Sequence, residues 1–257
     1  GMCLIPPTGL SNRIQAGIVI DRFMDPGDGT TFFAPGLAAM GPEYPSNTYT
    51  RQDSGSGILM GQGTRNLLLE LVGDGPFPFN AAVGWMPAGQ LDLATFGEEG
   101  ARLSLTYQID SGAMDLTAEG ASMFVIRFLS LDPGFDDFLR LATTVTDSEG
   151  VQAVHAVDLA ETTTAVGYEL PFSEFVFDDP SGSPGGDPLD VLKDAQTIQF
   201  TFNAHDIPIS NVDFSIVSIS TIPEPAAAVL GLIGLAAVAL FWSSRASRLT
   251  RRDPRYR

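Results

Sequence analysis

The feature that most constrains this fold is a succession of short runs rich in Val, Ile, Thr, Phe, Tyr and Leu, separated by clusters of Gly, Pro, Asp and Ser. Runs of this length and composition, bounded by turn-forming residues, predict β-strands. The predicted strands are residues 17–20, 46–51, 57–60, 65–72, 79–85, 91–96, 101–109, 122–130, 138–146, 151–159, 162–170, 197–203 and 212–220. Apart from a predicted helical turn at 189–195, the chain before residue 222 shows no helical pattern. The sequence therefore predicts an all-β fold, a single antiparallel β-sandwich over residues 17–221.

Alternation within the runs predicts which side chains face the core. In the run ARLSLTYQI at 101–109, Leu103, Leu105 and Tyr107 fall on one face, and Arg102 and Ser104 begin the other. Successive side chains of a strand point to opposite faces, so the first set is expected in the core and the second toward solvent. The final run, 212–220, alternates less cleanly, and we expect both of its faces to be covered.

The charge of the chain excludes some classes of partner. The formal net charge is −17, and six of the 14 basic residues follow Trp242, so the body is strongly acidic. Such a body repels nucleic acid and anionic membrane surfaces, so no nucleic-acid partner is expected. An acidic surface is also what keeps an exported protein soluble. The single cysteine, Cys3, excludes an intrachain disulfide, which a core of this size does not require.

The first 16 residues give no sign of a signal peptide. Gly1 precedes Met2, and no basic segment leads into an apolar stretch of the length that a signal peptide needs. We interpret residues 1–16 as an N-terminal extension, and we expect a signal peptide upstream of Gly1 because the other end of the chain indicates export.

The C-terminal segment predicts a membrane-spanning helix. Residues 226–242 are free of charge, and 17 residues of helix span about 25 Å, slightly less than a hydrocarbon core of about 30 Å. Trp242 falls where an interfacial aromatic side chain belongs. It is followed by the topology-setting cations Arg245, Arg248, Arg251 and Arg252. Since positive flanks remain cytoplasmic, the acidic body is expected outside the inner membrane. A helix buried in the core is the alternative, but an all-β body offers no obvious groove for it.

The triplet Pro223-Glu224-Pro225 stands immediately before this apolar segment. Two prolines around a glutamate cannot enter a helix interior, so the triplet is predicted to be extended and exposed, as a protease requires. The order of Pro-Glu-Pro, hydrophobic helix and arginine cluster over residues 222–257 resembles the sorting signal of PEP-CTERM proteins. The resemblance implies that Pro223, Glu224 and Pro225 are recognised by an exosortase, a membrane-embedded processing enzyme. It also implies a Gram-negative bacterium as the source, and export to the cell surface or to an extracellular or biofilm matrix.

The body also resembles carbohydrate-binding jelly rolls. The stretches that carry this likeness are IDRFMD at 20–25, ELPFSEF at 169–175, TIQFTFN at 197–203 and VDFSIVSIS at 212–220. The resemblance implies a jelly-roll-like sandwich and a possible extracellular polysaccharide partner. We therefore expect a non-catalytic surface or matrix protein. A secreted carbohydrate-active enzyme or binding module that uses the tail only for delivery is one alternative, and a permanently anchored protein without processing is another.

Few residues are candidates for chemistry. The two histidines, His155 and His205, belong to no zinc-binding or nucleophile motif, so no catalytic residue is predicted. Asp21, Asp25 and Asp28 lie close together around a Pro-Gly turn, and their carboxylates predict a structural calcium site, although aspartate also favours turns for local reasons. No other cofactor is expected.

Sugar rings are often held by exposed aromatic side chains. Trp85, Tyr107, Phe128 and Tyr168 lie on or near predicted strands, where packing in the core explains most of them. An aromatic-lined concave face would favour the carbohydrate-active alternative, and a filled or flat face would favour the non-catalytic surface protein.

Overall fold

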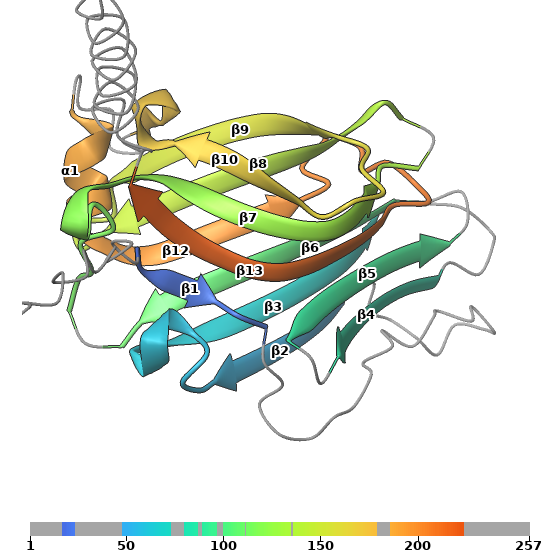
Figure 1. Cartoon of the computed structure of the whole chain (residues 1–257), viewed down its shortest axis with the longest axis horizontal. Coiled ribbons are helices and arrows are strands. Elements are labelled where there is room, and N and C mark those ends of the chain that lie inside the picture. The colour runs from blue at the N-terminus through green and yellow to red at the C-terminus, as the bar shows by residue number, and fades with distance from the viewer. Residues whose placement is uncertain are drawn as a thin grey trace, which may run out of the picture. The chain divides into compact units, whose positions relative to one another are not determined.

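The computed structural model describes residues 17–23, 48–72, 80–86, 89–96, 100–110, 112–134, 136–178 and 186–223. The chain divides into two compact units, Gly1–Ile222 and Pro223–Arg257, and every described residue except Pro223 belongs to the first. The first unit contains two β-sheets that lie face to face (Figure 1). Every strand pair whose register is described is antiparallel, so the prediction of an antiparallel all-β body is confirmed. The finer assignment to the jelly rolls stays a prediction.

One sheet has six strands. Its order is β10 (Val166–Pro171), β7 (Ala121–Asp132), β13 (Asp213–Pro223), β5 (Gln90–Phe96) and β4 (Asn80–Met86), with β1 (Val19–Asp21) also paired to β13. Strand β13 pairs with β5 through its first residues and with β1 through Ile219 and Ser220. It therefore lies in the interior of the sheet, with a neighbouring strand along each edge. Its outward side chains Ser215 and Val217 are partly exposed, so the expectation that both faces are covered stays a prediction.

The other sheet has seven strands. Its order is β11 (Val176–Asp178), β9 (Gln152–Ala160), β8 (Phe138–Asp147), β12 (Ala195–Phe202), β6 (Gly100–Ile109), β3 (Gly63–Val72) and β2 (Thr48–Ser54). The 3₁₀ turns η1 (Leu59–Gly61), η2 (Ala118–Gly120) and η3 (Phe172–Glu174) connect strands, and α1 (Pro188–Lys193) precedes β12. The side chain of Asp187 caps α1 by accepting a hydrogen bond from the Leu189 N–H, and Pro188 stands in its first turn. The predicted helical turn at 189–195 is thus confirmed.

Phenylalanine side chains from both sheets form the centre of the core. Phe124 of β7 packs edge-on against Phe200 of β12, with ring centroids 5.5 Å apart. Phe202 of β12 lies 5.1 Å from Phe214 of β13 and 6.2 Å from Phe128 of β7. All five rings are buried. Because each ring comes from an inward position of a period-two strand, this alternation fixes which face of each sheet remains free.

Two strand predictions need correction. Residues 57–60 were predicted as a strand, but Leu59 and Met60 belong to η1, because Leu59, Met60 and Gly61 all have positive φ angles and turn the chain. Residues 162–170 were predicted as one strand, but β10 begins only at Val166. The short strand β11 was not predicted, because three residues next to a Pro- and Gly-rich stretch give no periodic signal.

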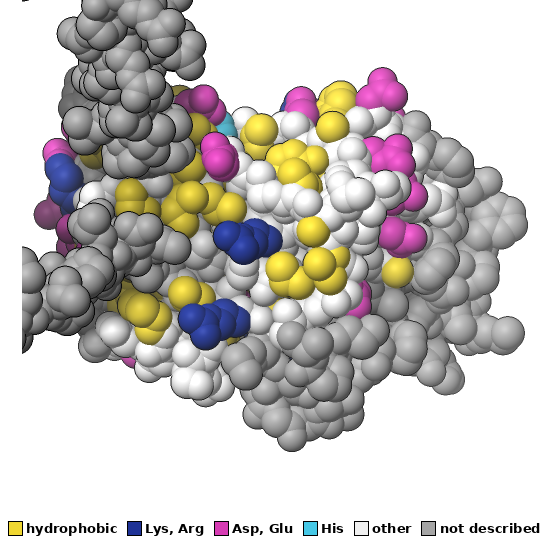
Figure 2. Space-filling model, in the orientation of Figure 1, with side chains coloured by type: hydrophobic (Ala, Val, Ile, Leu, Met, Phe, Trp, Pro, Cys, Tyr) yellow, Lys and Arg dark blue, Asp and Glu magenta, His cyan; other side chains and the backbone are white. Residues whose placement is uncertain are grey.

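Figure 2 shows the outward face of the six-stranded sheet, which is the sheet nearer the viewer in Figure 1. Hydrophobic and basic side chains are interspersed over the strands, and acidic side chains gather toward the right of the view. In the part of the chain that the structure describes, no helix is long and apolar enough to cross a membrane. The predicted helix at 226–242 lies outside that part.

Candidate ligand-binding face

The outward face of the seven-stranded sheet is uncharged over its centre. The strand register brings outward-facing side chains from different strands into rows that cross the sheet. One row contains Asn66, Thr106, Gln199 and Thr144, and the next contains Thr64, Gln108, Thr197 and Thr146. In a chain with a net charge of −17, these rows offer only neutral hydrogen-bonding groups.

A third row lies between the first of these neutral rows and a charged one and has, apart from one leucine, small side chains, so we infer that it forms the floor of a trough. It contains Leu68, Ser104, Thr201, Ala142 and Ala156, contributed by β3, β6, β12, β8 and β9. The hydroxyl oxygens of Ser104 and Thr201 lie 3.3 Å apart, within hydrogen-bonding distance. Since neighbouring strands lie about 4.8 Å apart, this row is about 19 Å long. We call it, with the rows on either side, the transverse trough.

The trough opens into a hollow at its β2–β3–β6 end. The hollow has a volume of about 460 Å³, and its polar lining is Thr50, Gln52, Asn66, Ser104, Thr106 and Gln199, together with Arg51, whose guanidinium is paired with Asp53. Asn66, Thr106 and Gln199 are partly exposed, and none of their side chains makes a hydrogen bond within the described part of the chain. Their donors and acceptors are therefore available to a ligand.

The opposite wall of the trough carries charges. It is the row of Glu70, Arg102, Arg140 and Asp158. The Arg140 guanidinium donates two hydrogen bonds to the Asp158 carboxylate, at 2.8 and 3.1 Å. These hydrogen bonds and the charge of Arg140 lower the pKa of Asp158. A ligand in the trough therefore meets a neutral wall on one side and a charged, hydrogen-bonded wall on the other.

His205 holds the charged wall in place. Its Nε2 accepts a hydrogen bond of 3.1 Å from the Arg140 backbone N–H, and its carbonyl accepts one of 2.8 Å from Arg102 Nη2. Because Nε2 is an acceptor in this contact, the ring proton of a neutral His205 must lie on Nδ1. The ring also packs against Phe138, with centroids 5.5 Å apart. Side chains fixed in this way lose little conformational entropy when a ligand binds.

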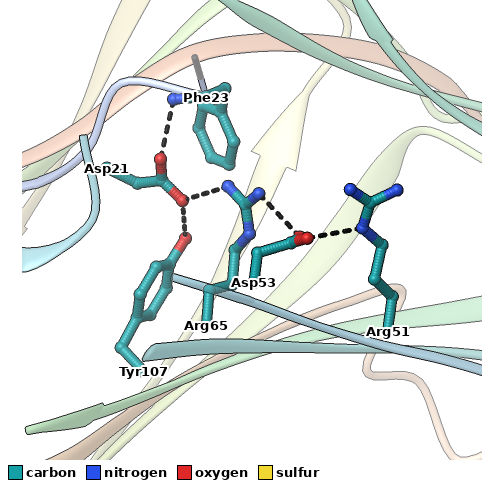
Figure 3. A network of polar contacts seen from close by, with 6 residues as sticks. All are labelled: Asp21, Phe23, Arg51, Asp53, Arg65 and Tyr107. Carbon is teal, nitrogen blue, oxygen red and sulfur yellow. Dashed lines mark hydrogen bonds and ion pairs between the residues drawn. The ribbon is translucent and has the colours of Figure 1, made fainter. Parts of the chain in front are cut away.

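Asp21, one of the predicted calcium ligands, lies in a buried ionic network (Figure 3). Its carboxylate accepts hydrogen bonds from Arg65 Nη1 at 2.6 Å, Tyr107 Oη at 2.9 Å and the Phe23 N–H at 2.7 Å. Arg65 also pairs with Asp53 at 3.0 Å, and Asp53 pairs with Arg51. The network joins β1, β2, β3 and β6. It lies between the two sheets, because Arg65 and Tyr107 take inward positions of their strands.

Burial and charge act against each other in this network. Burial raises the pKa of Asp21, while Arg65 and the donated hydrogen bonds oppose the rise. Burial, together with the Asp21 carboxylate, raises the pKa of the Tyr107 phenol well above its ordinary value. Burial acts to lower the pKa of Arg65, but Asp21 and Tyr107 outweigh it. The net pKa is raised above its ordinary value, so this guanidinium remains charged. The arrangement is that of a structural clamp, in which each charged side chain is paired with one of opposite charge.

Most other predicted site residues lie outside the described part of the chain. Among the calcium ligands these are Asp25 and Asp28, and in the tail they are Glu224, Pro225, Trp242, Arg245, Arg248, Arg251 and Arg252. Pro223 is the last residue of β13. Within the described ranges, no three His, Cys, Asp or Glu side chains are grouped to hold a metal ion. The calcium site and the sorting motif therefore stay predictions.

The aromatic residues considered as sugar platforms do not line the trough. Tyr107 and Phe128 are fully buried, and Tyr168 is partly buried with its hydroxyl donating to the Ala160 carbonyl. The side chain of Trp85 lies outside the described part of the structure. His155 packs against Phe175 with ring centroids 5.3 Å apart, in agreement with a structural role.

Sequence reasoning missed the trough but anticipated one strand of it. The alternation of residues 101–109 predicted that Arg102, Ser104 and Thr106 face solvent. All three lie on the outward face, but only Arg102 and Thr106 are partly exposed, whereas Ser104 is buried. The partners on β3, β8, β9 and β12 come from distant parts of the chain, and only the register joins them into rows. The phase of Arg65, which matches the buried Leu67 and Leu69, is the signal that would have revealed a buried arginine.

Comparisons with known proteins assign no family to the chain. No family model matches it, and no curated protein matches it. Among solved structures, it is similar to the family 11 carbohydrate-binding module of the cellulosomal cellulase Lic26A-Cel5E of Clostridium thermocellum. The identity is 13%, the TM-score is 0.35, and the match covers 76% of this chain and 96% of the module. It is also similar to the carbohydrate-binding module TmCBM61 in complex with β-1,4-galactotriose (10%, TM-score 0.29, 76% and 99%), and to the agarase AgWH50C (9%, TM-score 0.38, 60% and 24%).

Proposed function

We propose that this chain is an exported, non-catalytic bacterial surface or matrix protein that binds a neutral polysaccharide in the transverse trough. The observation that carries the proposal is the chemistry of the trough. On a strongly acidic protein, its floor and one wall present uncharged Thr, Ser, Asn and Gln side chains across four strands. Neutral glycans match such a surface, because their many hydroxyl groups donate and accept hydrogen bonds and they carry no charge.

The geometry also supports an extended ligand. A floor about 19 Å long, flanked by side chains on both sides, suits an oligosaccharide lying across the strands better than a single sugar. The charged wall adds the fixed donors and acceptors of Arg102, Arg140 and Asp158, which favour one orientation of the bound chain. Such preorganised groups contribute to selectivity among glycans more than to affinity.

The test is a binding assay on immobilised neutral polysaccharides, with xylan, mannan, galactan, β-1,3-glucan and β-1,4-glucan as probes. We expect retention on at least one of them. Gln199→Ala, which removes an amide from the neutral wall, is expected to weaken binding about tenfold, the equivalent of about 1.4 kcal/mol. Thr163→Ala, at an exposed position beyond β9, is the matched control and is expected to bind like the wild type. Equal retention of the Gln199 variant on every polymer would contradict a ligand in the trough.

We further propose that the C-terminal segment is a PEP-CTERM sorting signal that an exosortase-type enzyme processes. The support is the order of Pro223-Glu224-Pro225, the uncharged segment 226–242 and the arginines that follow it. We expect the mature protein in its native host to lack residues 226–257, with its new C-terminus next to Pro-Glu-Pro. Mass spectrometry of the intact mature protein measures this. Retention of residues 226–257 would show that the tail is a permanent anchor.

A further inference from the structure

A second hollow lies on the opposite side of the sandwich, on the outward face of the six-stranded sheet. Its volume is about 460 Å³, and it lies over β7, β10 and β13. The register places Gly167 directly opposite Arg127, and Glu169 directly opposite Val125. Gly167 keeps the hollow open, because a Cβ at this position would lie 3.2 Å from Val125 Cγ1. Figure 2 shows hydrophobic side chains on this face with basic side chains among them.

The hollow combines an apolar floor with one donor wall and one acceptor wall. Val125, Val166 and Val217 contribute apolar surface, while Arg127 and Glu169 are exposed at its sides. Within the described part of the chain, neither of these two charged side chains makes an ion pair or a hydrogen bond. Arg127 can therefore donate, and Glu169 can accept, at separate positions around the floor.

This arrangement matches the two-sided chemistry of a sugar ring. A pyranose has an apolar face of C–H groups and a rim of hydroxyls that both donate and accept hydrogen bonds. The opposite charges of Arg127 and Glu169 leave the hollow without net charge, so a neutral ring matches it better than a charged one does. We propose that this hollow is a second glycan-binding site, which takes one uncharged pyranose unit with its apolar face on Val125 and Val217. The proposal shares its ligand class with the proposed function, but it concerns separate residues.

A site-resolved titration tests the proposal. Amide chemical shifts of the full chain are followed by NMR while neutral hexasaccharides are added, with xylo-, manno-, galacto- and gluco-oligosaccharides as the probes. We expect saturable shifts in two separate groups of amides, one around Ser104, Thr201 and Gln199 and one around residues 125–129 and 166–169. Gly167→Val fills the hollow with a residue that strands favour, and it is expected to weaken the second group's apparent affinity at least tenfold. Arg127→Ala is expected to do the same, and Arg22→Ala, another exposed arginine, is the matched control.

The outcomes separate this proposal from the trough. If Gly167→Val leaves the shifts at 125–129 and 166–169 unchanged, or if these amides never move while the trough amides do, the second site is wrong. If they move and the trough amides do not, the second site stands and the trough is wrong. Shifts at the hollow with oligogalacturonate alone would overturn the assignment of a neutral ligand. The absence of shifts with every probe would overturn both sites.

Discussion

Arg65 occupies a position that the period-two pattern of β3 assigns to the core. It lies near the start of the strand and is fully buried, and its guanidinium forms ion pairs with Asp21 and Asp53. Arg65→Met is expected to destabilise the protein by about 3–5 kcal/mol, because it leaves the buried Asp21 without its cation and Asp53 with Arg51 alone. Arg140→Met, which removes the exposed pair with Asp158, is the matched control and is expected to cost far less, because solvent screens this pair. Urea unfolding at pH 7 measures both. Similar losses for the two variants would contradict a stabilising role for the buried network.

Tyr107 makes the same network sensitive to alkaline pH. The unfolded chain releases the phenol proton near pH 10, whereas the folded state retains it to higher pH, so unfolding releases a proton in this range and stability falls as the pH rises. Tyr107→Phe is expected to be less stable at pH 8 by about 1–2 kcal/mol, because the hydrogen bond to Asp21 is lost. This deficit is expected to narrow by about 1 kcal/mol between pH 9 and pH 11, since phenylalanine does not titrate. Urea unfolding over this pH range measures the deficit. A deficit that stays constant would show that Tyr107 ionises normally.

At the scale of elements, strand identities were predictable because alternation within a run is a local property. The inward set of β6 and the strands β3, β8, β9, β12 and β13 follow from it. The positions of η1 and of the trough were not predictable. Three consecutive positive φ angles at Leu59, Met60 and Gly61 depend on the packing of the buried Leu59, and the trough depends on register between strands far apart in sequence. Arg140 and Asp158 are 18 residues apart, and Ser104 and Thr201 are 97 apart. A short stretch of sequence therefore includes neither a whole wall nor the whole floor of the trough.

The connection from β7 to β8 gives a prediction about an element. Gly134 has a φ of +75°, and a Cβ there would lie 2.3 Å from the Ser210 carbonyl oxygen. Gly134→Ala is therefore expected to cost more than about 2 kcal/mol, from backbone strain and from separation of this turn from residues 210–211. Gly112 has a φ of +79° but no neighbouring atom within 4 Å, so Gly112→Ala isolates the backbone cost of about 1 kcal/mol. Thermal unfolding of both variants measures the difference, and equal losses would show that the close approach to Ser210 is unimportant.

At the scale of the whole molecule, the two proposed sites face away from each other, because one lies on each sheet of the sandwich. A short glycan cannot occupy both sites at once. One protein molecule can, however, bind two long polysaccharide molecules, one at each site, and so link them. We expect the wild-type protein to raise the turbidity and viscosity of a solution of its polysaccharide, with a maximum at intermediate protein concentration, as bivalent binding requires. Gly167→Val and Gln199→Ala are each expected to retain binding to the polymer through the unchanged site. Each is expected to cross-link less, with the turbidity maximum lowered, because the other site is weakened about tenfold or more. Undiminished cross-linking in both single variants would indicate that the protein links polysaccharide molecules by self-association. It would contradict cross-linking through two sites on opposite faces of one protein molecule.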